Sequence, residues 1–434
     1  MNFYKKYLIC FLVICILPYF GKSQNPAPAP AQSSSILIMN ATAHLGNGRV
    51  IENSAIGFDN GKLILVGDAT RIKLDKSTYK TVIDGAGKHV YPGFISCNTT
   101  LGLAEIDLVR STNDYSEVGE MNSNVRSIIS YNTDSKIIPT VRSNGVLMAQ
   151  VVPQGGVISG QSSVVTMDAW NWEDAAYKTD EGMHINWPRM YIAHVAYAEN
   201  EDVQKNRMNQ QLAAIDLFFR EAKAYVSQSA PTEKNLRFEA MRGVFDGTKK
   251  LYVHADFVKE IIAAVDFCKK YSIKMVLVGG SDAWRVADLL KENSVPVVLG
   301  RVHSLPPRED DDVDLPYKLP SLLNKAGIVY TETMDGSWQS RNVMFNAGTT
   351  SAYGVSKEDA VRSLTLYPAQ ILGIDQTTGS LEVGKDATLF LSTGDALDMR
   401  GNNVERAFIQ GRDINLDNVQ KQLYRKYQTK YGIQ

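Results

Sequence analysis

The chain has 434 residues, and its 46 Lys+Arg against 47 Asp+Glu give a formal net charge of −1 at neutral pH. Charged residues make up 21% and the AVILMFWYC set 44%, which excludes a collagen-like, mostly disordered or coiled-coil chain. The balanced charge argues against nucleic acid or anionic lipid as the main partner, because both require a basic surface. The length fits one large barrel domain with a small companion, or two to three ordinary domains.

The N-terminus has the layout of a signal peptide. A basic start precedes an apolar stretch over residues 7–20, and the small residues Gly21 and Ser23 stand at positions −3 and −1 of a cut after Ser23. The apolar stretch is too short to span a bilayer comfortably. We therefore expect residues 1–23 to be cleaved near Ser23 from an exported protein, periplasmic or extracellular and without a membrane span. A buried N-terminal helix is the alternative.

Both ends of the remaining chain predict short strands and tight turns. A Pro/Ala/Ser linker over residues 24–35 comes first. Predicted strands follow in 36–41, 56–67, 81–85, 379–393 and 404–414. The Asp59-Asn60-Gly61 sequence predicts a hairpin, because Asn-Gly supplies the positive φ values of a tight turn. We expect residues 36–90 and 375–412 to form one β-sandwich domain, followed by a helical or frayed tail over 413–434.

The middle of the chain alternates strands and helices. The predicted strands are 145–153, 251–257, 273–280, 295–300 and 328–333, and the predicted helices are 256–271, 282–293 and 319–327. Strand–helix alternation with short links is typical of a parallel sheet or closed barrel, which we place in residues 91–374. Functional residues of such a barrel lie at the C-terminal ends of its strands. That rule selects 96–100, 153–161, His254, 279–282, His303 and 331–335.

Several segments carry a family resemblance. They are VIDGAGKHVYPGFI (82–95), GVLMAQVVPQGGVISGQSSVV (145–165), VHADF (253–257) and NAGTTSAYGVSKEDAVRSLTLYPAQILGIDQTTGSLEVGKDATLFL (346–391). With these segments the chain resembles the amidohydrolase superfamily and, within it, the imidazolonepropionase-like branch. The resemblance implies an α/β fold with a distorted (β/α)8 barrel of the TIM type and a small β-sandwich domain built from both chain ends.

The ligand set that the resemblance implies is incomplete. The family places His-x-His after the PGFI strand to hold a divalent metal, whereas this chain has Asn98 and Thr100 there. His254 matches the mid-barrel histidine, while Gly279 or Gly280 stands where the next histidine is expected. Amide and hydroxyl groups are not competent zinc ligands beside imidazole. We therefore predict His254 as the remaining metal ligand and Asn98, Thr100 and Gly279 as incompetent positions; a packed, hydrogen-bonded His254 is the alternative.

Other site residues are predicted from the resemblance and from the strand ends. The family's last-strand Asp, which activates water, has only Glu332 and Asp335 nearby, so these are the candidate catalytic carboxylates. Gln154, Gln161 and His303 are the candidate substrate-binding residues.

Two functions remain open at this point. The first, implied by the resemblance, is a secreted hydrolase of non-peptide C–N bonds in a small cyclic amide or dipeptide-like substrate, using a divalent metal such as zinc. The second is a catalytically inactive barrel without a metal, which serves as a binding module or as the structural partner of an active paralogue. The expected partners are a small-molecule substrate and a second chain, in a homodimer or in a heterodimer with an active amidohydrolase.

Overall fold

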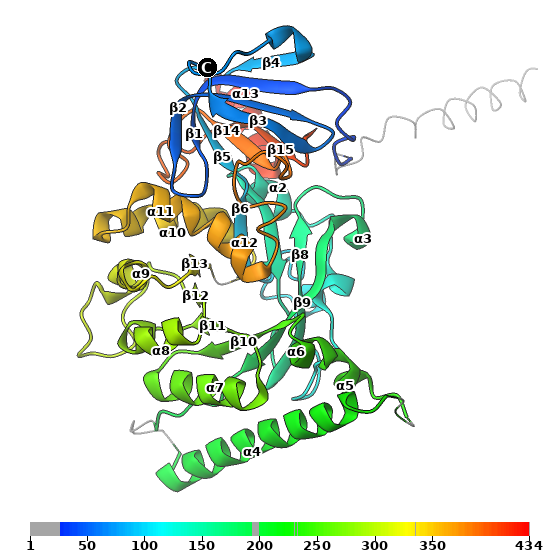
Figure 1. Cartoon of the computed structure of the whole chain (residues 1–434), viewed down its shortest axis with the longest axis vertical. Helices are drawn as coiled ribbons and strands as arrows, with labels where there is room; N and C mark the ends of the chain where they lie inside the picture. The colour runs from blue at the N-terminus through cyan, green and yellow to red at the C-terminus, as the bar shows by residue number, and fades with distance from the viewer. Residues whose placement is uncertain (1–26, 193–198, 230, 232, 335, 434) are drawn as a thin grey trace, which may run out of the picture.

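The computed structural model describes residues 27–192, 199–229, 231, 233–334 and 336–433. The predicted signal peptide, its cleavage site and the first residues of the linker lie outside the described residues. The chain forms a sheet domain from its two ends, a barrel, and a long helix that lies outside the barrel, on the side away from the sheet domain (Figure 1). Among the described residues, no helix combines the length and apolar character needed to cross a membrane.

The sheet domain joins strands that are far apart in sequence. Its strands are β1 (Ile36–His44), β2 (Val50–Asp59), β3 (Lys62–Asp68), β4 (Thr81–Asp84), β5 (His89–Pro92), β14 (Leu389–Ser392), β15 (Val404–Ile409) and β16 (Arg412–Asp413). They lie in the order β16-β15-β14-β5-β1-β2-β3, with β4 also paired to β1. The predicted hairpin is present, since Asn60 and Gly61 have φ values of 48° and 77° between β2 and β3.

The second sheet is the barrel wall. Its strands, in both sequence and spatial order, are β6 (Phe94–Thr99), β7 (Val146–Val151), β8 (Ile158–Thr166), β9 (Ala176–Asn186), β10 (Lys250–Ala255), β11 (Met275–Gly279), β12 (Val297–Leu299) and β13 (Tyr330–Glu332). All neighbours are parallel except β8, which runs antiparallel to β7 and β9. The two edge strands approach each other where Oγ1 of Thr333 donates to the Cys97 carbonyl at 2.5 Å. The predicted fold class, a distorted (β/α)8 barrel with a domain from both ends, is confirmed.

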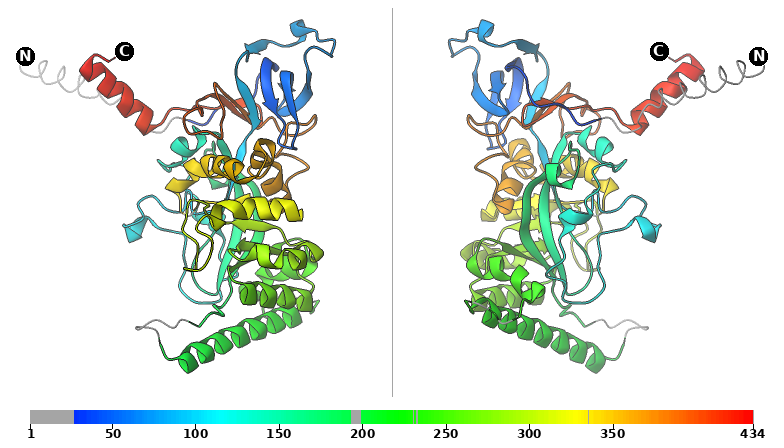
Figure 2. Two further views of the ribbon diagram at one scale, coloured as in Figure 1. Left: turned by 90° about the vertical axis from the view of Figure 1, so that its left-hand side faces the viewer. Right: turned by 90° about the vertical axis from the view of Figure 1, so that its right-hand side faces the viewer.

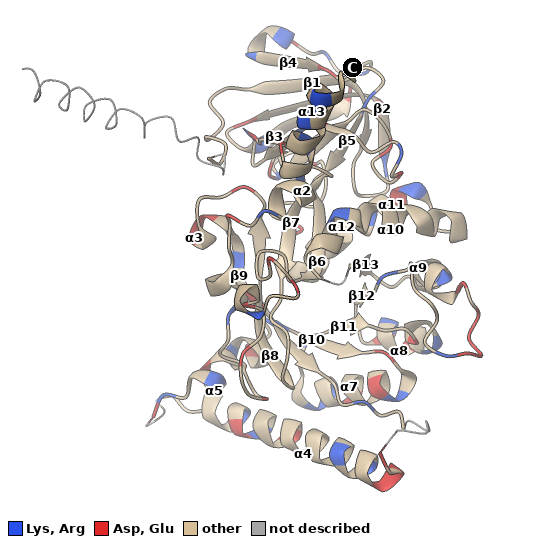
Figure 3. Ribbon diagram, turned by 180° about the vertical axis from the view of Figure 1, so that it is seen from behind, with Lys and Arg blue, Asp and Glu red and all other residues tan. Residues whose placement is uncertain are grey.

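Helices cover the outside and the N-terminal end of the barrel. They are α2 (Ile138–Arg142), α3 (Trp172–Ala175), α4 (Glu201–Val226), α5 (Leu236–Ala240), α6 (Arg242–Asp246), α7 (Val258–Tyr271), α8 (Ala287–Glu292), α9 (Leu315–Ala326), α10 (Val343–Thr350), α11 (Lys357–Arg362) and α12 (Leu366–Leu372). The helix α13 (Val419–Tyr431) projects from the body and buries none of its residues (Figure 2). Charges of both signs are mixed along α4, in keeping with the near-zero net charge (Figure 3).

Side-chain alternation divides the barrel wall into two faces. Along β10, Leu251 and Val253 pack outward in the helix-facing core, whereas Tyr252 belongs to the core inside the barrel. Residues two apart on a strand share a face, so His254 also faces inward. Ile371 of α12 packs into the inner core and closes the N-terminal end of the barrel. The opposite, C-terminal end therefore remains the accessible one.

Candidate functional site

A cavity of about 260 Å³ lies at the C-terminal end of the barrel. Its lining residues are Asn98, Trp187, Arg189, His254, Ala255, Asp256, Phe257, Glu260, Val278, Gly279, Gly300 and Thr333. They come from the ends of β6, β9, β10, β11, β12 and β13 and from the residues that follow these strands. This end of a TIM-type barrel is where functional residues converge.

Asn98 reaches the cavity from an irregular strand end. The β6–β7 register shifts between Ser96 and Thr99, and Asn98 has a φ of 50°. A left-handed backbone at a residue other than glycine persists only where surrounding contacts fix it. One such contact is the backbone N–H of Asn98, which donates to Oε1 of the fully buried Gln150 at 3.1 Å. The position of Asn98 is therefore set from inside the barrel.

His254 is held by a second histidine. Its Nε2 lies 3.0 Å from Nδ1 of His184, which is fully buried on β9. Burial lowers the pKa of His254 to about 4. Burial also lowers the pKa of His184 well below its usual value, with a smaller contribution from His254. Both imidazoles are consequently neutral near pH 7.

The acidic residues of the cavity are occupied by hydrogen bonds. Oδ1 of Asp256 accepts from the backbone N–H and the Oγ of Ser281, at 3.2 and 2.7 Å. Glu260 accepts from the backbone N–H groups of Met190, Asp256 and Phe257 at the start of α7. The exposed Arg189, in contrast, makes no ion pair with a described residue. A guanidinium that lines a cavity and pairs with no described residue favours ligands that bring a carboxylate or carbonyl oxygen.

A buried polar network lies deeper in the barrel. Glu181 on β9 accepts from Nε2 of Gln150 at 2.6 Å, from Oγ of Ser162 at 2.5 Å and from OH of Tyr252 at 3.0 Å. The Tyr252 ring in turn stacks on His184, with centroids 4.6 Å apart and planes 7° from parallel. Glu181 thus supports both sides of the cavity, through Gln150 toward Asn98 and through Tyr252 toward His184.

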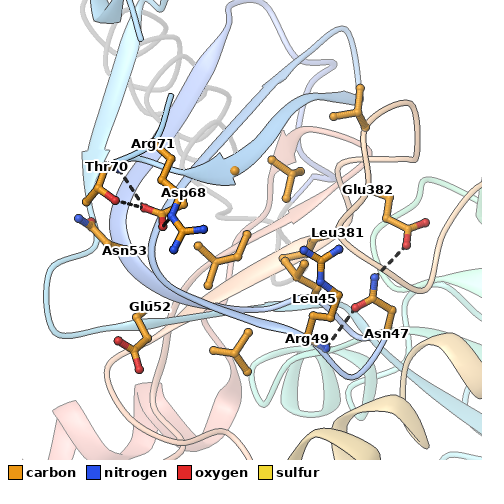
Figure 4. A pocket seen from close by; sticks show the side chains of 15 residues that line it. Leu45, Asn47, Arg49, Glu52, Asn53, Asp68, Thr70, Arg71, Leu381 and Glu382 are labelled. Carbon is orange, nitrogen blue, oxygen red and sulfur yellow. Dashed lines mark hydrogen bonds and ion pairs between the residues drawn. The ribbon is translucent and has the colours of Figure 1, made fainter. Parts of the chain in front are cut away.

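A larger hollow of about 690 Å³ lies on the sheet domain, remote from the barrel end (Figure 4). Its charged groups are largely paired with each other or with neighbours. Asp68 binds Thr70 and Arg71, and Glu382 accepts from Asn47 at 3.0 Å. This hollow is lined by no histidine or cysteine. We therefore place the candidate site in the smaller cavity.

Comparison with known proteins shows what this chain is similar to. Residues 318–414 match the model of the amidohydrolase family. An amidohydrolase from Thermotoga maritima MSB8 superposes with a TM-score of 0.75 at 24% identity, covering 87% of this chain and 99% of that chain. The predicted resemblance to the amidohydrolase superfamily is confirmed.

Two further solved structures share this amidohydrolase-like fold. A molinate hydrolase has a TM-score of 0.54 at 14% identity, covering 89% of this chain and 95% of that chain. A Xaa-Pro dipeptidase with bound methionine in its active site has a TM-score of 0.53 at 13% identity, covering 88% and 99%. No curated protein matches the sequence. At these identities the likeness establishes the fold, and the imidazolonepropionase-like branch stays a prediction.

The residues of this amidohydrolase-like barrel do not fit the metal centre expected of the family. Among the described residues, no three His, Cys, Asp or Glu side chains cluster closely enough to hold a metal ion. Nε2 of His254 is within hydrogen-bond distance of His184, and Asn98 offers only an amide. A histidine in place of Gly279 would also be strained, because φ there is +94° and a Cβ would lie 2.8 Å from Oδ1 of Asp256. Three protein ligands and an open position are the usual catalytic zinc arrangement.

Neither of the two candidate catalytic carboxylates is among the described residues that line this cavity. Glu332 ends β13 on the same face as Tyr330, which packs in the helix-facing core. Its Oε2 accepts from Oγ of Ser363, at the end of α11, at 2.7 Å. Burial raises the pKa of Glu332 to about 7. Asp335 lies outside the described residues.

The three candidate substrate-binding residues are not among the residues that line the cavity. Gln161 on β8 accepts a hydrogen bond from Nζ of Lys249. Gln154 is exposed, and its backbone N–H donates to the Tyr115 carbonyl at 2.6 Å. His303 is exposed, with Nε2 2.8 Å from Oγ1 of Thr349. Their roles stay predictions.

Sequence reasoning missed His184, Glu181 and Arg189. All three lie on or just after β9, whose sequence AYKTDEGMHIN lacks the apolar run of the other barrel strands. The available signal was that His184, like His254, stands within two residues of the C-terminal end of its strand. Such a position is too weak a signal to identify a site by itself. The resemblance directed attention to the family's ligand positions instead.

Proposed function

We propose that this protein hydrolyses a C–N bond in a small amide or dipeptide-like substrate, and that the substrate binds in the cavity at the C-terminal end of the barrel. The observation that carries the proposal is the convergence of His254, Asn98 and Arg189 at that end. The family match over the last barrel strand and the fold shared with a known amidohydrolase support the same class.

The cavity favours a small and oxygen-bearing substrate. Its volume of about 260 Å³ is at or below the lower end of drug-sized ligand pockets, which is about 300 Å³. Arg189 can hold a carboxylate or carbonyl oxygen, and the neutral His254 can form a hydrogen bond without a charge to be desolvated. Asp256 and Glu260 are anchored by their own hydrogen bonds, so they shape the wall.

Binding without turnover is the second candidate function. The residues at the family's metal positions favour it, because Asn98, Thr100 and Gly279 provide neither charge nor imidazole for a metal that would activate water. The chain would then recognise the same class of ligand and release it unchanged. Export of the protein, a homodimer and a heterodimer with an active amidohydrolase remain further proposals; N-terminal sequencing and co-purification test them.

One experiment separates the two functions. Purified protein lacking residues 1–23 is assayed for hydrolysis and for saturable binding across a panel of small cyclic amides and dipeptides. His254→Asn and Arg189→Gln are the test variants. Arg71→Gln is the control, since that side chain is 85% exposed on the sheet domain.

The outcomes have distinct meanings. Turnover that both test variants reduce at least roughly tenfold, with the control unchanged, supports the hydrolase. Saturable binding of unchanged ligand, weakened in the same variants, supports the binding module instead. A panel that shows neither, or losses equal in the control, overturns the assignment of this cavity.

A further inference from the structure

The contact between His184 and His254 involves a single proton. Nδ1 of His184 and Nε2 of His254 lie 3.0 Å apart, which is a hydrogen-bond distance. His184 is fully buried, and neither ring makes an ion pair with a described carboxylate, so both rings are neutral near pH 7 and each carries one N–H and one bare nitrogen. The proton in the contact belongs either to Nδ1 of His184 or to Nε2 of His254.

The surroundings of His184 distinguish the two arrangements. Its other ring nitrogen, Nε2, is buried and has no hydrogen-bond partner among the residues that the structure describes. If His254 donated, the proton of His184 would sit on this Nε2 and leave a buried N–H without an acceptor. If His184 donates, the same atom is only a bare acceptor. Buried N–H groups without partners are rarer in proteins than under-used acceptors, so donation by His184 is the less costly arrangement.

We infer that His184 is a positioning residue, which donates its Nδ1–H to Nε2 of His254 and thereby fixes His254 with an N–H on Nδ1. Nδ1 of His254 makes no hydrogen bond to a described residue, and His254 lines the cavity. His254 therefore offers a ligand a hydrogen-bond donor. Its bare nitrogen, the one able to accept a proton or bind a metal, is covered by His184.

This arrangement specifies the ligand chemistry, in a step that rests on the proposed function. A donor at Nδ1 of His254 and the guanidinium of Arg189 both require an acceptor, such as the carbonyl or carboxylate oxygen of an amide or N-acyl amino acid. Ligands that present an N–H or a cation to His254 are disfavoured. A neutral imidazole donor can polarise a carbonyl without carrying a charge into the cavity.

The network below His184 keeps its ring in this orientation. Tyr252 stacks against the ring at 4.6 Å, and the hydroxyl of Tyr252 donates to Oε2 of Glu181 at 3.0 Å. Glu181 is in turn bound by Gln150 and Ser162. The orientation of His184 is thus tied to strands β7, β8 and β10 as well as to its own strand.

Nitrogen NMR of the ligand-free protein tests the inference directly. Long-range ¹H–¹⁵N spectra at pH 7 report which ring nitrogen of each histidine carries the proton. The chain has six histidines, and the spectra of His184→Asn and His254→Asn assign the two that matter. The expected result is an Nδ1–H form for both His184 and His254. An Nε2–H form of His254 overturns the inference.

Two variants separate donation from packing. His184→Asn can place an amide N–H where Nδ1 lies, so His254 should keep its Nδ1–H form. His184→Phe retains an aromatic ring over Tyr252 but has no donor, and His254 should then populate the Nε2–H form. Equal spectra for His254 in the two variants would show that His184 does not set the proton. The wild-type spectrum decides even if a variant fails to fold, and it does not depend on whether any panel compound binds or reacts.

Discussion

Two regions of the barrel wall each bury a glutamate, and the two glutamates differ in the number of hydrogen bonds they accept. Inside the barrel, Glu181 accepts hydrogen bonds from three side chains on three strands. Outside, in the layer between β13 and the helices, Glu332 accepts one hydrogen bond from Ser363, and its Oε1 has no partner in the described part of the chain. Both carboxyl groups are buried, with Glu332 at 0% exposure and Glu181 at 3%.

The difference shows that burial alone does not place a carboxylate beside the cavity. Burial raises the pKa of Glu332 to about 7, a value often associated with catalytic acids and bases. Yet Glu332 faces the helix layer. Burial raises the pKa of Glu181 as well, but its three hydrogen bonds oppose that shift. Glu181, which supports the cavity, is the carboxyl group that accepts hydrogen bonds from three side chains.

The largest expected effect follows from removing Glu181. Glu181→Ala leaves the amide of Gln150 and the hydroxyls of Ser162 and Tyr252 without their shared acceptor inside the barrel. We expect a loss of about 3–5 kcal/mol in the free energy of unfolding, measured by urea denaturation at pH 7.

The matched control is Glu52→Ala, on an exposed position of β2, where we expect a change of about 0.5 kcal/mol or less. Glu181→Gln keeps the shape and should cost less than alanine. If Glu181→Ala were as mild as the control, the interior network would not be what holds the barrel end.

Glu332→Gln tests the other side of the comparison. The carboxyl binds its proton more tightly in the folded state, with a pKa of about 7 against an ordinary value of 4.5. Stability should therefore fall as pH rises from about 4.5 to about 7 and stay level above, by roughly 3 kcal/mol for this group. The glutamine variant lacks this dependence, so it should gain on the wild type as pH rises and be the more stable protein at pH 8.

Denaturation curves at pH 5 and pH 8 check this expectation. The free energy of unfolding of the wild type, minus that of the variant, should be more negative at pH 8 than at pH 5. A difference that is independent of pH would mean that Glu332 is already ionised in the folded protein, and the contrast with Glu181 would then disappear.

The fold could be predicted from the sequence because its signals are local and repeated. The Asn60-Gly61 turn requires positive φ at two residues, and the apolar spacing of Ile261, Val265 and Cys268 places them on the buried face of α7. These patterns survive in the tertiary structure because they encode burial. The antiparallel course of β8 was not predicted, since its pairing with β7 and β9 depends on contacts distant in sequence.

The site was harder to predict because it depends on the direction in which each side chain points from its strand. Glu332 stands at the end of the last barrel strand, where sequence reasoning looks for a catalytic carboxylate, but the alternation of side chains along a strand turns it outward. His184 comes from a strand that the apolar pattern does not reveal. Packing against the rest of the barrel decides which face a polar strand residue occupies. The sequence of one strand does not show it.

The smallest effect we predict comes from Ser363→Ala. The hydroxyl of Ser363 lies 2.7 Å from Oε2 of Glu332 and 2.9 Å from the Ala360 carbonyl. When Glu332 is ionised, the hydroxyl donates to it; when Glu332 is protonated, Glu332 can donate to the hydroxyl, which then donates to Ala360. Alanine removes a hydrogen bond that favours the charged carboxylate, so it should raise the pKa of Glu332 further and cost about 1 kcal/mol at pH 8.

A double-mutant cycle with Glu332→Gln isolates this hydrogen bond. The coupling between the two positions should be larger at pH 8 than at pH 5, because only the ionised carboxylate depends on the hydroxyl as a donor. Carboxyl ¹³C NMR of Glu332 in the single variant reports the pKa directly. A coupling that does not change with pH would assign the Ser363 hydroxyl to Ala360 at both values, and Glu332 would then be a buried carboxyl with no donor for either oxygen.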